Sequence, residues 1–479
     1  MKKISLLYSL IIFALLTIFF IILHPIAIFD TDDWAFIHHL RLPIPVIGAW
    51  NPIKVFPEIT MSFFSYAGAY VLYPITGRYC YSLSITNGLF ICFMITIYFL
   101  EFFLLICKKY DLNLVKGVLI STIFICLHFT IVTHIGNNNI FLFYAYDLTC
   151  IYHYTLSTVV NASLVMHMIR IGGYQNFSNQ SKRHKTLIAI WTYFAIFSSL
   201  YTNVIIAVYI GVELLVSLID KIRSHQFKSN KYCLQYKNSI IILIIWLISL
   251  AIEVTGGRST GRESNYLQGF FDAFTNIWTW FALFNPLFLV LSAIIIVLWI
   301  KNVKNKNVTF VKYFLSLVLT SLYLILLSSV VDSSYVTRID VIFAADFWLL
   351  LILMLFLIEI LPTLKKERIL IAGLTSLSII GTIYSSVSCK EINYINIEYK
   401  QCEALTDDII NQFKTAEGNG ETEIDLLVPK FDNEINWPYG LWQADDFSKA
   451  MYRHRITHDK ITVRQMIPSM DKTHEFITP

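Results

Sequence analysis

Charge is scarce in this sequence. Asp, Glu, Lys and Arg make up only 15% of its 479 residues, whereas 56% are hydrophobic. A soluble domain needs more charge than this to cover its surface, so the composition argues against a soluble globular protein. The net charge is only +4, and we expect no nucleic-acid partner. The aromatic share of 15% suits a membrane protein, because Trp and Tyr rings settle at the headgroup level of a bilayer.

A cleavable signal peptide is also missing. Residues 4–24 follow Lys2 and Lys3 and form an apolar run of about 20 residues, enough to cross a bilayer of ~30 Å. The run is too long for the hydrophobic part of a signal peptide, and no small-residue cleavage site follows it. We therefore expect an uncleaved first transmembrane helix.

Ten further apolar runs are long enough, or nearly so, to span a bilayer. They cover residues 85–107, 115–134, 150–169, 187–200, 204–219, 240–254, 277–300, 314–331, 342–361 and 369–387. Lys and Arg gather in every second gap: at Lys2–Lys3, Lys108–Lys116, Arg170–Lys185, Lys221–Lys237, Lys301–Lys312 and Lys365–Arg368. Cytoplasmic loops carry this excess. The pattern predicts an all-α polytopic membrane bundle of about 11 transmembrane helices, with the N-terminus inside and the C-terminus outside.

The stretch from residue 25 to residue 83 is predicted to form one large external loop. It contains the moderately apolar segment 59–73, which is short and carries Ser and Gly. Counting this segment as a span would place Lys108 and Lys109 outside, so we interpret it as an interfacial amphipathic helix. The alternative is a genuine twelfth transmembrane helix.

The composition changes near residue 389, where apolar runs shorten and charge rises. We therefore divide the chain into a transmembrane domain, residues 1–388, and a small external domain, residues 389–479. Residues 404–416 have helical spacing, residues 423–428 and 461–464 favour strands, and Gly418–Gly420 favours a turn. The second domain is thus expected to be α/β. Cys389 and Cys402 both lie in it, where a disulfide could form.

The external loops carry the charges that suggest chemistry. Asp30, Asp32 and Asp33 follow the first helix directly. Arg258, Arg262 and Arg338 lie in later external loops, against the positive-inside bias, and Lys54 lies in the first loop. Guanidinium groups bind phosphate oxygens in pairs, and a carboxylate facing them could remove a proton from an incoming hydroxyl. The set therefore suggests general-base attack on an activated phosphate ester at one membrane face.

Plainer interpretations of these residues stay open. An Asp-rich turn after a helix is often a solvated cap, and His38 and His39 are more often polar contacts than ligands. No metal-ligand spacing accompanies them, so no divalent metal cofactor is expected. Trp437, Tyr439 and Trp442 could stack on sugars or could form the core of the small domain.

Taken in order, these segments resemble the GT-C superfamily of membrane glycosyltransferases, and more narrowly the bacterial serotype-converting O-antigen glucosyltransferases. The similar segments are Asp32-Asp33-Trp34 after the first helix, Trp50–Lys54, Tyr152-His153-Tyr154, Thr255–Arg262, Trp437-Pro438 and Tyr452–Ile456. Two depart from the family pattern: Lys54 stands where relatives often have Arg, and Gly256-Gly257-Arg258 replaces a Pro-Gly-Asn order.

The resemblance implies an inverting hexosyltransferase in the bacterial inner membrane, with its active site facing the periplasm. Its donor would be an undecaprenyl-phosphate sugar, expected to be glucose, and its acceptor a lipid-linked O-antigen or another surface glycan of the lipopolysaccharide type. Asp30, Asp32 or Asp33 would be the base. Arg258, Arg262, Arg338 and Lys54 would hold the donor phosphate, and Trp34, His38, His39, Trp437 and Trp442 would contact sugars.

Membrane lipids, a flippase and a donor synthase would be the partners of such an enzyme. Two other classes stay open: a transporter or flippase of lipid-linked glycans, and an O-antigen polymerase or ligase. Transporters usually show internal repeats and charges near the midplane, and no clear repeat is present. Polymerases and ligases usually place their main loop late in the chain, whereas here the acidic loop comes first.

Overall fold

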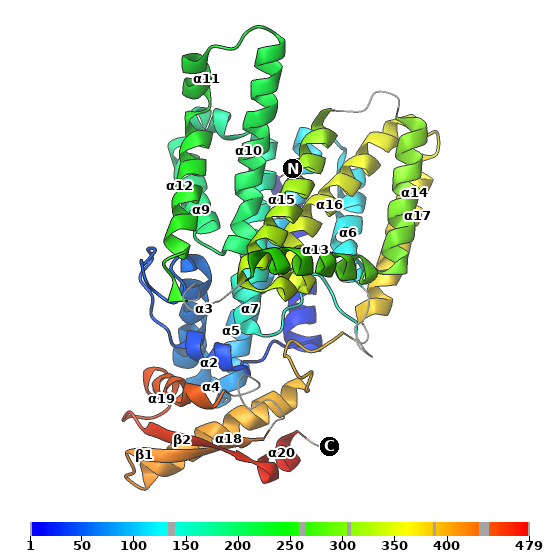
Figure 1. The fold of residues 1–479 in the computed structure, drawn as a ribbon. Coiled ribbons are helices and arrows are strands. Elements are labelled where there is room, and N and C mark those ends of the chain that lie inside the picture. Colours follow the sequence, from blue (N-terminus) through cyan, green and yellow to red (C-terminus); the bar gives the residue numbers. More distant parts are fainter. Residues whose placement is uncertain are drawn as a thin grey trace.

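The computed structural model describes residues 2–132, 139–257, 265–303, 308–386, 389–430 and 440–477. Helices dominate it, and the two strands lie near the C-terminus. Figure 1 shows long helices running side by side and a smaller C-terminal unit packed against one end of them. The prediction of a helical bundle with a small α/β unit is confirmed at this level.

The helices between the N-terminus and residue 386 differ widely in length. They are α1 (Lys2–Thr17), α2 (Thr31–Ile37), α3 (Val55–Ala67), α4 (Tyr73–Thr76), α5 (Tyr79–Lys109), α6 (Leu114–Thr130), α7 (Leu148–Cys150), α8 (Ser157–Ile171), α9 (Lys182–Ile196), α10 (Leu200–Arg223), α11 (Ser229–Gln235), α12 (Lys237–Glu253), α13 (Tyr266–Ala282), α14 (Pro286–Asn302), α15 (Val308–Val331), α16 (Ile339–Ile360) and α17 (Glu367–Ser386). Helical turns of π type at Ile18–Leu23 and Ile151–Leu156 extend α1 and join α7 to α8.

Six helices of the described segments are long and apolar enough to cross a membrane, and a seventh is added if the bent pair α11 and α12 is one span. Two shorter apolar helices, α6 and α14, accompany them. The chain is therefore a multi-pass helical membrane protein, while the count of eleven spans stays a prediction. Residues 187–219, which could have formed one tilted helix or two, form the separate helices α9 and α10.

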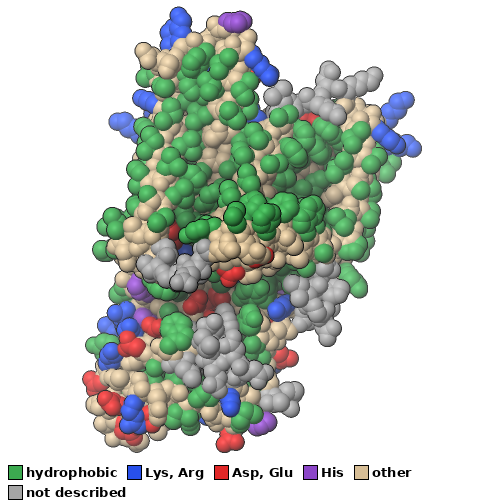
Figure 2. Space-filling model, in the orientation of Figure 1, with side chains coloured by type: hydrophobic (Ala, Val, Ile, Leu, Met, Phe, Trp, Pro, Cys, Tyr) green, Lys and Arg blue, Asp and Glu red, His purple; other side chains and the backbone are tan. Residues whose placement is uncertain are grey.

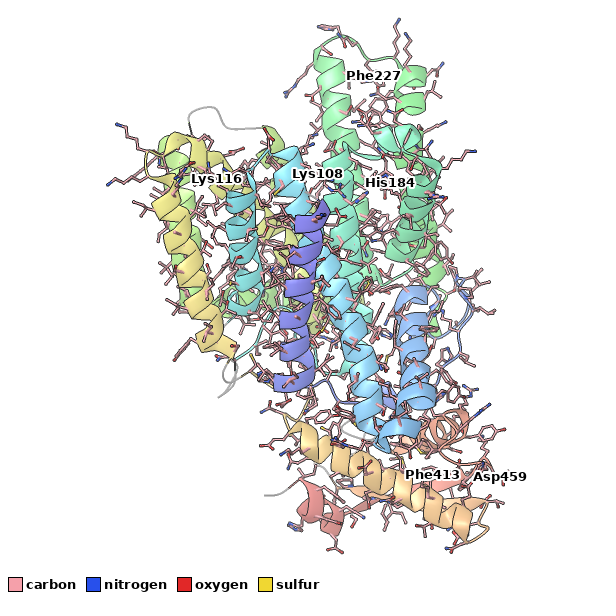
Figure 3. All side chains as sticks on the ribbon, turned by 180° about the vertical axis from the view of Figure 1, so that it is seen from behind. Lys108, Lys116, His184, Phe227, Phe413 and Asp459 are labelled. Atoms are coloured by element: carbon pink, nitrogen blue, oxygen red, sulfur yellow. The ribbon has the colours of Figure 1, made fainter. Side chains whose placement is uncertain are left out.

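The basic loops lie together at one end of the bundle. Figure 3 places Lys108, Lys116, His184 and Phe227 at this end, and Phe413 and Asp459 of the C-terminal unit at the opposite end. The predicted alternation of basic and non-basic loops thus corresponds to two physical ends of the molecule. Which end faces the cytoplasm stays a prediction.

The predicted span 277–300 is wrong, because the structure divides it into two helices. α13 ends at Ala282 and α14 begins at Pro286. Pro286 has no backbone N–H to continue a helix, and the side chain of Asn285 accepts a hydrogen bond from Leu287 N at 2.9 Å, which caps the new helix. Figure 1 shows that α13 runs crosswise to the long helices.

The side chains of α13 fall into three stripes. Ala273, Ile277 and Trp280 are buried. Exposed apolar side chains follow one flank: Tyr266, Leu267, Phe271, Phe274, Trp278 and Phe281. Gln268, Asp272, Thr275 and Thr279 follow the other flank. A helix with this division lies flat at a membrane–water boundary, with one flank in lipid and the other in water. Figure 2 shows hydrophobic side chains along the edge of α13 that faces the long helices.

Cysteine labelling can test this placement of α13. In a Cys233→Ser background, which removes the exposed native cysteine, we expect a water-soluble maleimide to label Thr279→Cys much faster than Trp278→Cys in membranes. Detergent solubilisation should bring the two rates closer, because both native side chains are exposed in the structure. Equal rates in membranes would contradict a flat interfacial position.

The first loop folds into α2, α3 and α4 rather than an open segment. α3, with its continuation through Gly68–Leu72, packs against α5, and its Val55, Phe56 and Met61 are buried. It is not among the candidate spans of the described residues. The twelfth-helix alternative therefore gains no support.

The C-terminal unit combines α18 (Tyr399–Gly418), β1 (Glu423–Pro429), α19 (Ala444–Arg453), β2 (Thr462–Ser469) and α20 (Met470–Phe476). β1 and β2 pair in parallel from Glu423–Thr462 to Pro429–Ser469, with an irregularity between Ile424 and Asp425. All eight cysteines, each in a described segment, are free, including Cys389 and Cys402. The suggested disulfide is therefore absent from these described positions.

Candidate functional site

The acids after the first helix organise the start of α2. Asp30 is its N-cap: the Asp30 carboxylate accepts from Asp32 N at 3.0 Å, and Asp33 Oδ2 accepts in return from Asp30 N at 3.3 Å. This capping box satisfies backbone donors that the first helical turn would leave unpaired. Asp30 and Asp33 are buried, whereas Asp32 is partly exposed. The predicted acids thus differ in accessibility.

Asp33 also connects the first loop to a segment far along the chain. Its Oδ1 accepts hydrogen bonds from both the backbone N and the hydroxyl of Thr149, each at 2.8 Å. Thr149 lies in α7, whose N-cap is Asp147, and the Asp147 carboxylate accepts from Cys150 N. The acids of two distant loops therefore meet at α7.

Two of the predicted cations contact the same segment. Lys54 Nζ lies 3.2 Å from His153 Nδ1 and 5.5 Å from the centre of the Tyr154 ring. The Arg338 guanidinium lies 4.8 Å from that ring, and its Nη2 lies 3.1 Å from Cys150 Sγ. Residues 147–154 are therefore the meeting point of the first-loop acids, Lys54 and Arg338. We call these residues the junction segment.

Arg338 is already paired within the protein. Its Nε and Nη2 donate to the two oxygens of Asp340 at 3.1 and 2.6 Å; the Asp340 side chain is buried, and that of Arg338 is 13% exposed. A buried guanidinium needs such a partner, and the fork geometry of Arg suits a carboxylate. Arg338 is thus held beside Cys150 and Tyr154 of the junction segment.

Burial raises the pKa values of the acids at the junction segment. It raises the pKa of Asp30 well above its ordinary value, and the charges of Asp147, Asp33 and Asp32 add to the shift. Burial likewise raises the pKa of Asp147, with further contributions from Asp33 and Asp32. For Asp33 burial raises the pKa to about 6, although the hydrogen bonds from Thr149 oppose the shift. The protein thus holds several carboxyls together at an energetic cost, which is typical of functional sites.

Two carboxyl oxygens of this group have no hydrogen-bond partner among the described residues. They are Asp30 Oδ2 and Asp147 Oδ2, and both are shielded from solvent. Figure 2 shows acidic side chains gathered below α13, in the hollowed surface between the helical region and the C-terminal unit. Within the described ranges, no three His, Cys, Asp or Glu side chains are placed to hold one metal ion.

The residues predicted to contact sugars have different surroundings. Trp34 is fully buried and packs on Tyr79 and on Phe447 of α19, so no face of its ring is open in this structure. His38 is buried, with Nε2 3.4 Å from Asp446. His39 is exposed and lines a cavity of about 300 Å³ with Arg41 and Trp50, among others.

Trp442 is 64% exposed in the C-terminal unit. Arg258, Arg262 and Trp437 lie outside the described residues. The structure therefore brings Asp33, Lys54 and Arg338 into contact with the junction segment, with Asp30 and Asp32 beside Asp33.

Sequence reasoning missed Asp147. Asp147 is an isolated acid directly before an apolar run, whereas the acids of the first loop directly follow one. Asp340, which pairs with Arg338, was missed because it is a single acid in the first turn of α16, directly before the predicted apolar run 342–361.

Comparisons of this chain with protein-family models, curated proteins and solved structures give no match.

Proposed function

We propose that this protein is an inverting, GT-C-type glycosyltransferase that moves a hexose from a polyprenyl phosphate to a hydroxyl of a lipid-linked or surface glycan. The observation that carries the proposal is the junction segment, where carboxylates from two loops and two cations meet beside the membrane-spanning helices. A base and cations close together are what transfer from a phosphate-linked sugar requires.

Among the first-loop acids, Asp32 suits the role of base best. Asp33 uses both oxygens to accept hydrogen bonds from Phe29 N, Asp30 N and Thr149. Asp30 is buried, and its raised pKa favours the neutral form, which cannot accept a proton. Asp32 is partly exposed, and its backbone N–H is fixed by Asp30. Asp33 would then be a positioning residue.

In the proposed reaction the acceptor hydroxyl oxygen forms a bond to the anomeric carbon of the donor sugar. The bond between that carbon and the phosphate oxygen breaks, and polyprenyl phosphate leaves with the electron pair. The hydroxyl proton passes to the Asp32 carboxylate. Attack from the face opposite the phosphate inverts the anomeric configuration. Arg338 and Lys54 would stabilise the negative charge of the departing phosphate.

The position of the C-terminal unit supports an acceptor site on its side of the bundle. α19 packs on α2 through Phe447 and Trp34, and Tyr79 Oη lies 2.6 Å from His454 Nδ1. The unit is thus fixed to the loop that carries the proposed base. Periplasmic orientation and location in a bacterial inner membrane belong to the same proposal.

The direct test is mass spectrometry of surface polysaccharide from cells with and without the protein, in a host that supplies polyprenyl-phosphate sugars. We expect one added hexose per repeat unit, dependent on the protein and absent with the Asp32→Asn, Asp33→Asn double variant. The double variant should reach the membrane in similar amounts, which immunoblotting of membranes checks.

Other outcomes would favour other classes. An unchanged repeat mass with altered chain length would reject glycan modification in favour of polymerisation. No change in hosts that supply the donor and suitable acceptors would reject the enzyme and favour transport of lipid-linked glycans.

A further inference from the structure

A cavity of about 350 Å³ lies beside the buried Arg338–Asp340 pair. Its lining comes from three distant parts of the chain. They are Ile140 and residues 144–146 before α7; Thr337, Ile339 and Asp340 at the start of α16; and Lys390 and Tyr394 at the entry to the C-terminal unit. Pockets of this size can bury a small ligand. Lys390 and Tyr394 belong to neither the acidic loop nor the predicted phosphate-binding loops.

The backbone holds Lys390 firmly at this cavity. Lys390 N donates to Asn139 O at 2.7 Å, and Asn139 forms a bridge with Cys389. The side-chain amide of Asn139 donates in turn to Ser385 O at 2.8 Å. Residue 390 is therefore a fixed wall of the cavity rather than a loose linker.

The ammonium group of Lys390 differs from the Arg338 guanidinium in its surroundings. It lies 5.6 Å from the centre of the Tyr144 ring and is partly buried, and burial lowers its pKa. Within the described residues it makes no ion pair with a carboxylate, whereas Arg338 is paired with Asp340. A partly desolvated cation without a counter-ion is poised for an anionic ligand.

Tyrosines complete the cavity. The Tyr144 hydroxyl is buried and has no hydrogen-bond partner among the described residues. The rings of Tyr146 and Tyr394 meet edge to face at 5.6 Å, and Tyr146 also lies 5.0 Å from the Arg338 guanidinium. An ammonium over a tyrosine ring whose hydroxyl is unpaired among the described residues, with further aromatic walls, matches a phosphate that carries an organic substituent.

We propose that this cavity binds a phosphate monoester or diester, with Lys390 as the charge-pairing ligand and Tyr144 as a hydrogen-bond donor. The inference deepens the proposed function, because the phosphate would be that of the polyprenyl-phosphate donor. Asp340 lines the cavity, and its ion-pair partner Arg338 lies behind the lining against the Tyr146 ring. The entry segment of the C-terminal unit thereby becomes part of the donor site.

The test measures binding without sugar transfer. Thermal unfolding of the full-length protein in detergent is followed with a short-chain polyprenyl monophosphate, with the corresponding polyprenol, and with inorganic phosphate. We expect the monophosphate to raise the unfolding temperature of the wild type and of Lys390→Arg. The Lys390→Gln variant should lose at least about 10-fold in apparent affinity, which corresponds to about 1.4 kcal/mol and is the scale of a charge-assisted contact.

Lys400→Gln is the matched control, because Lys400 is exposed on α18 and the substitution makes the same change in charge. It should bind the monophosphate like the wild type. Stabilisation by the monophosphate alone identifies a lipid phosphate as the ligand, and equal stabilisation by inorganic phosphate identifies a free phosphate site. Equal affinity of Lys390→Gln and wild type, or no effect of either phosphate compound on the wild type, would overturn the inference.

The binding result and the proposed function can fail separately. Lys390-dependent phosphate binding without hexose transfer in cells would keep the cavity and reject the transferase. Hexose transfer that is insensitive to Lys390→Gln at low donor concentration would keep the transferase and reject the cavity as the phosphate site.

Discussion

Replacing Asp32 by Asn should reduce hexose transfer by about 10²–10⁴-fold, the usual contribution of a general base. The protein should remain folded, because the Asp32 side chain is partly exposed and the backbone N–H that Asp30 accepts is unchanged. Transfer is measured in membranes with a labelled polyprenyl-phosphate hexose, and folding is measured by the thermal unfolding temperature in detergent.

Asp33→Asn is the informative comparison. The substitution would turn an amide NH₂ group toward donors from which Asp33 now accepts, including Thr149 N and Oγ1 at 2.8 Å. We expect this variant to lose stability by at least about 2 kcal/mol, because bonds to a charged acceptor are lost. Activity should fall together with the unfolding temperature. If the double variant kept full turnover, neither acid would be the base.

The pH dependence of hexose transfer should reflect the protonation of Asp33 in the first loop. Because the pKa of Asp33 is raised to about 6, its carboxylate is charged above that pH and takes up a proton as the pH falls through it. The protonated group accepts the surrounding hydrogen bonds less well, so transfer should decline below about pH 6. A rate that stays constant as the pH is lowered through this pKa would contradict a positioning role for this carboxylate.

Arg338→Met should destabilise the protein by about 3–5 kcal/mol, the usual effect of leaving one member of a buried ion pair alone. Asp340 is only 2% exposed and pairs with no other cation among the described residues. The Tyr154 ring would also lose its contact with the guanidinium. Thermal unfolding in detergent measures the loss.

The Arg338→Met, Asp340→Asn double variant separates stability from function. Removing both charges should recover most of the lost stability, because no unpaired buried charge remains. Transfer should stay low, because the cation beside the departing phosphate is still absent. Recovery of both stability and transfer would mean that Arg338 has only a structural role.

Several features of the fold were predictable from local composition. The apolar runs indicated most of the long helices, since an unbroken run of this length can be stable only in lipid or in a buried core. The strands near residues 423–428 and 461–464 were also expected, and the structure pairs them in parallel. The break at Asn285-Pro286 was missed because the hydrophobic run continues through it, although Pro286 removes a helical donor.

Local patterns predicted only part of the candidate site. The Asp30–Asp33 turn stood out because acids follow an apolar helix, and Arg338 and Lys54 stood out as cations at one membrane face. Asp147 and Lys390 did not, because a single charge at the end of a run has no distinguishing pattern. Their importance comes from neighbours that are distant in the chain.

By itself the sequence determined a multi-pass helical membrane protein with basic loops at one end, because hydrophobicity and charge act locally on each segment. Only the tertiary structure decided which charges meet. Thr149 lies 116 positions from Asp33, His153 lies 99 from Lys54, and Arg338 lies 188 from Cys150. Packing of separate helices brings these pairs together at the junction segment, because contacts between distant segments depend on the shapes of all the surfaces in between.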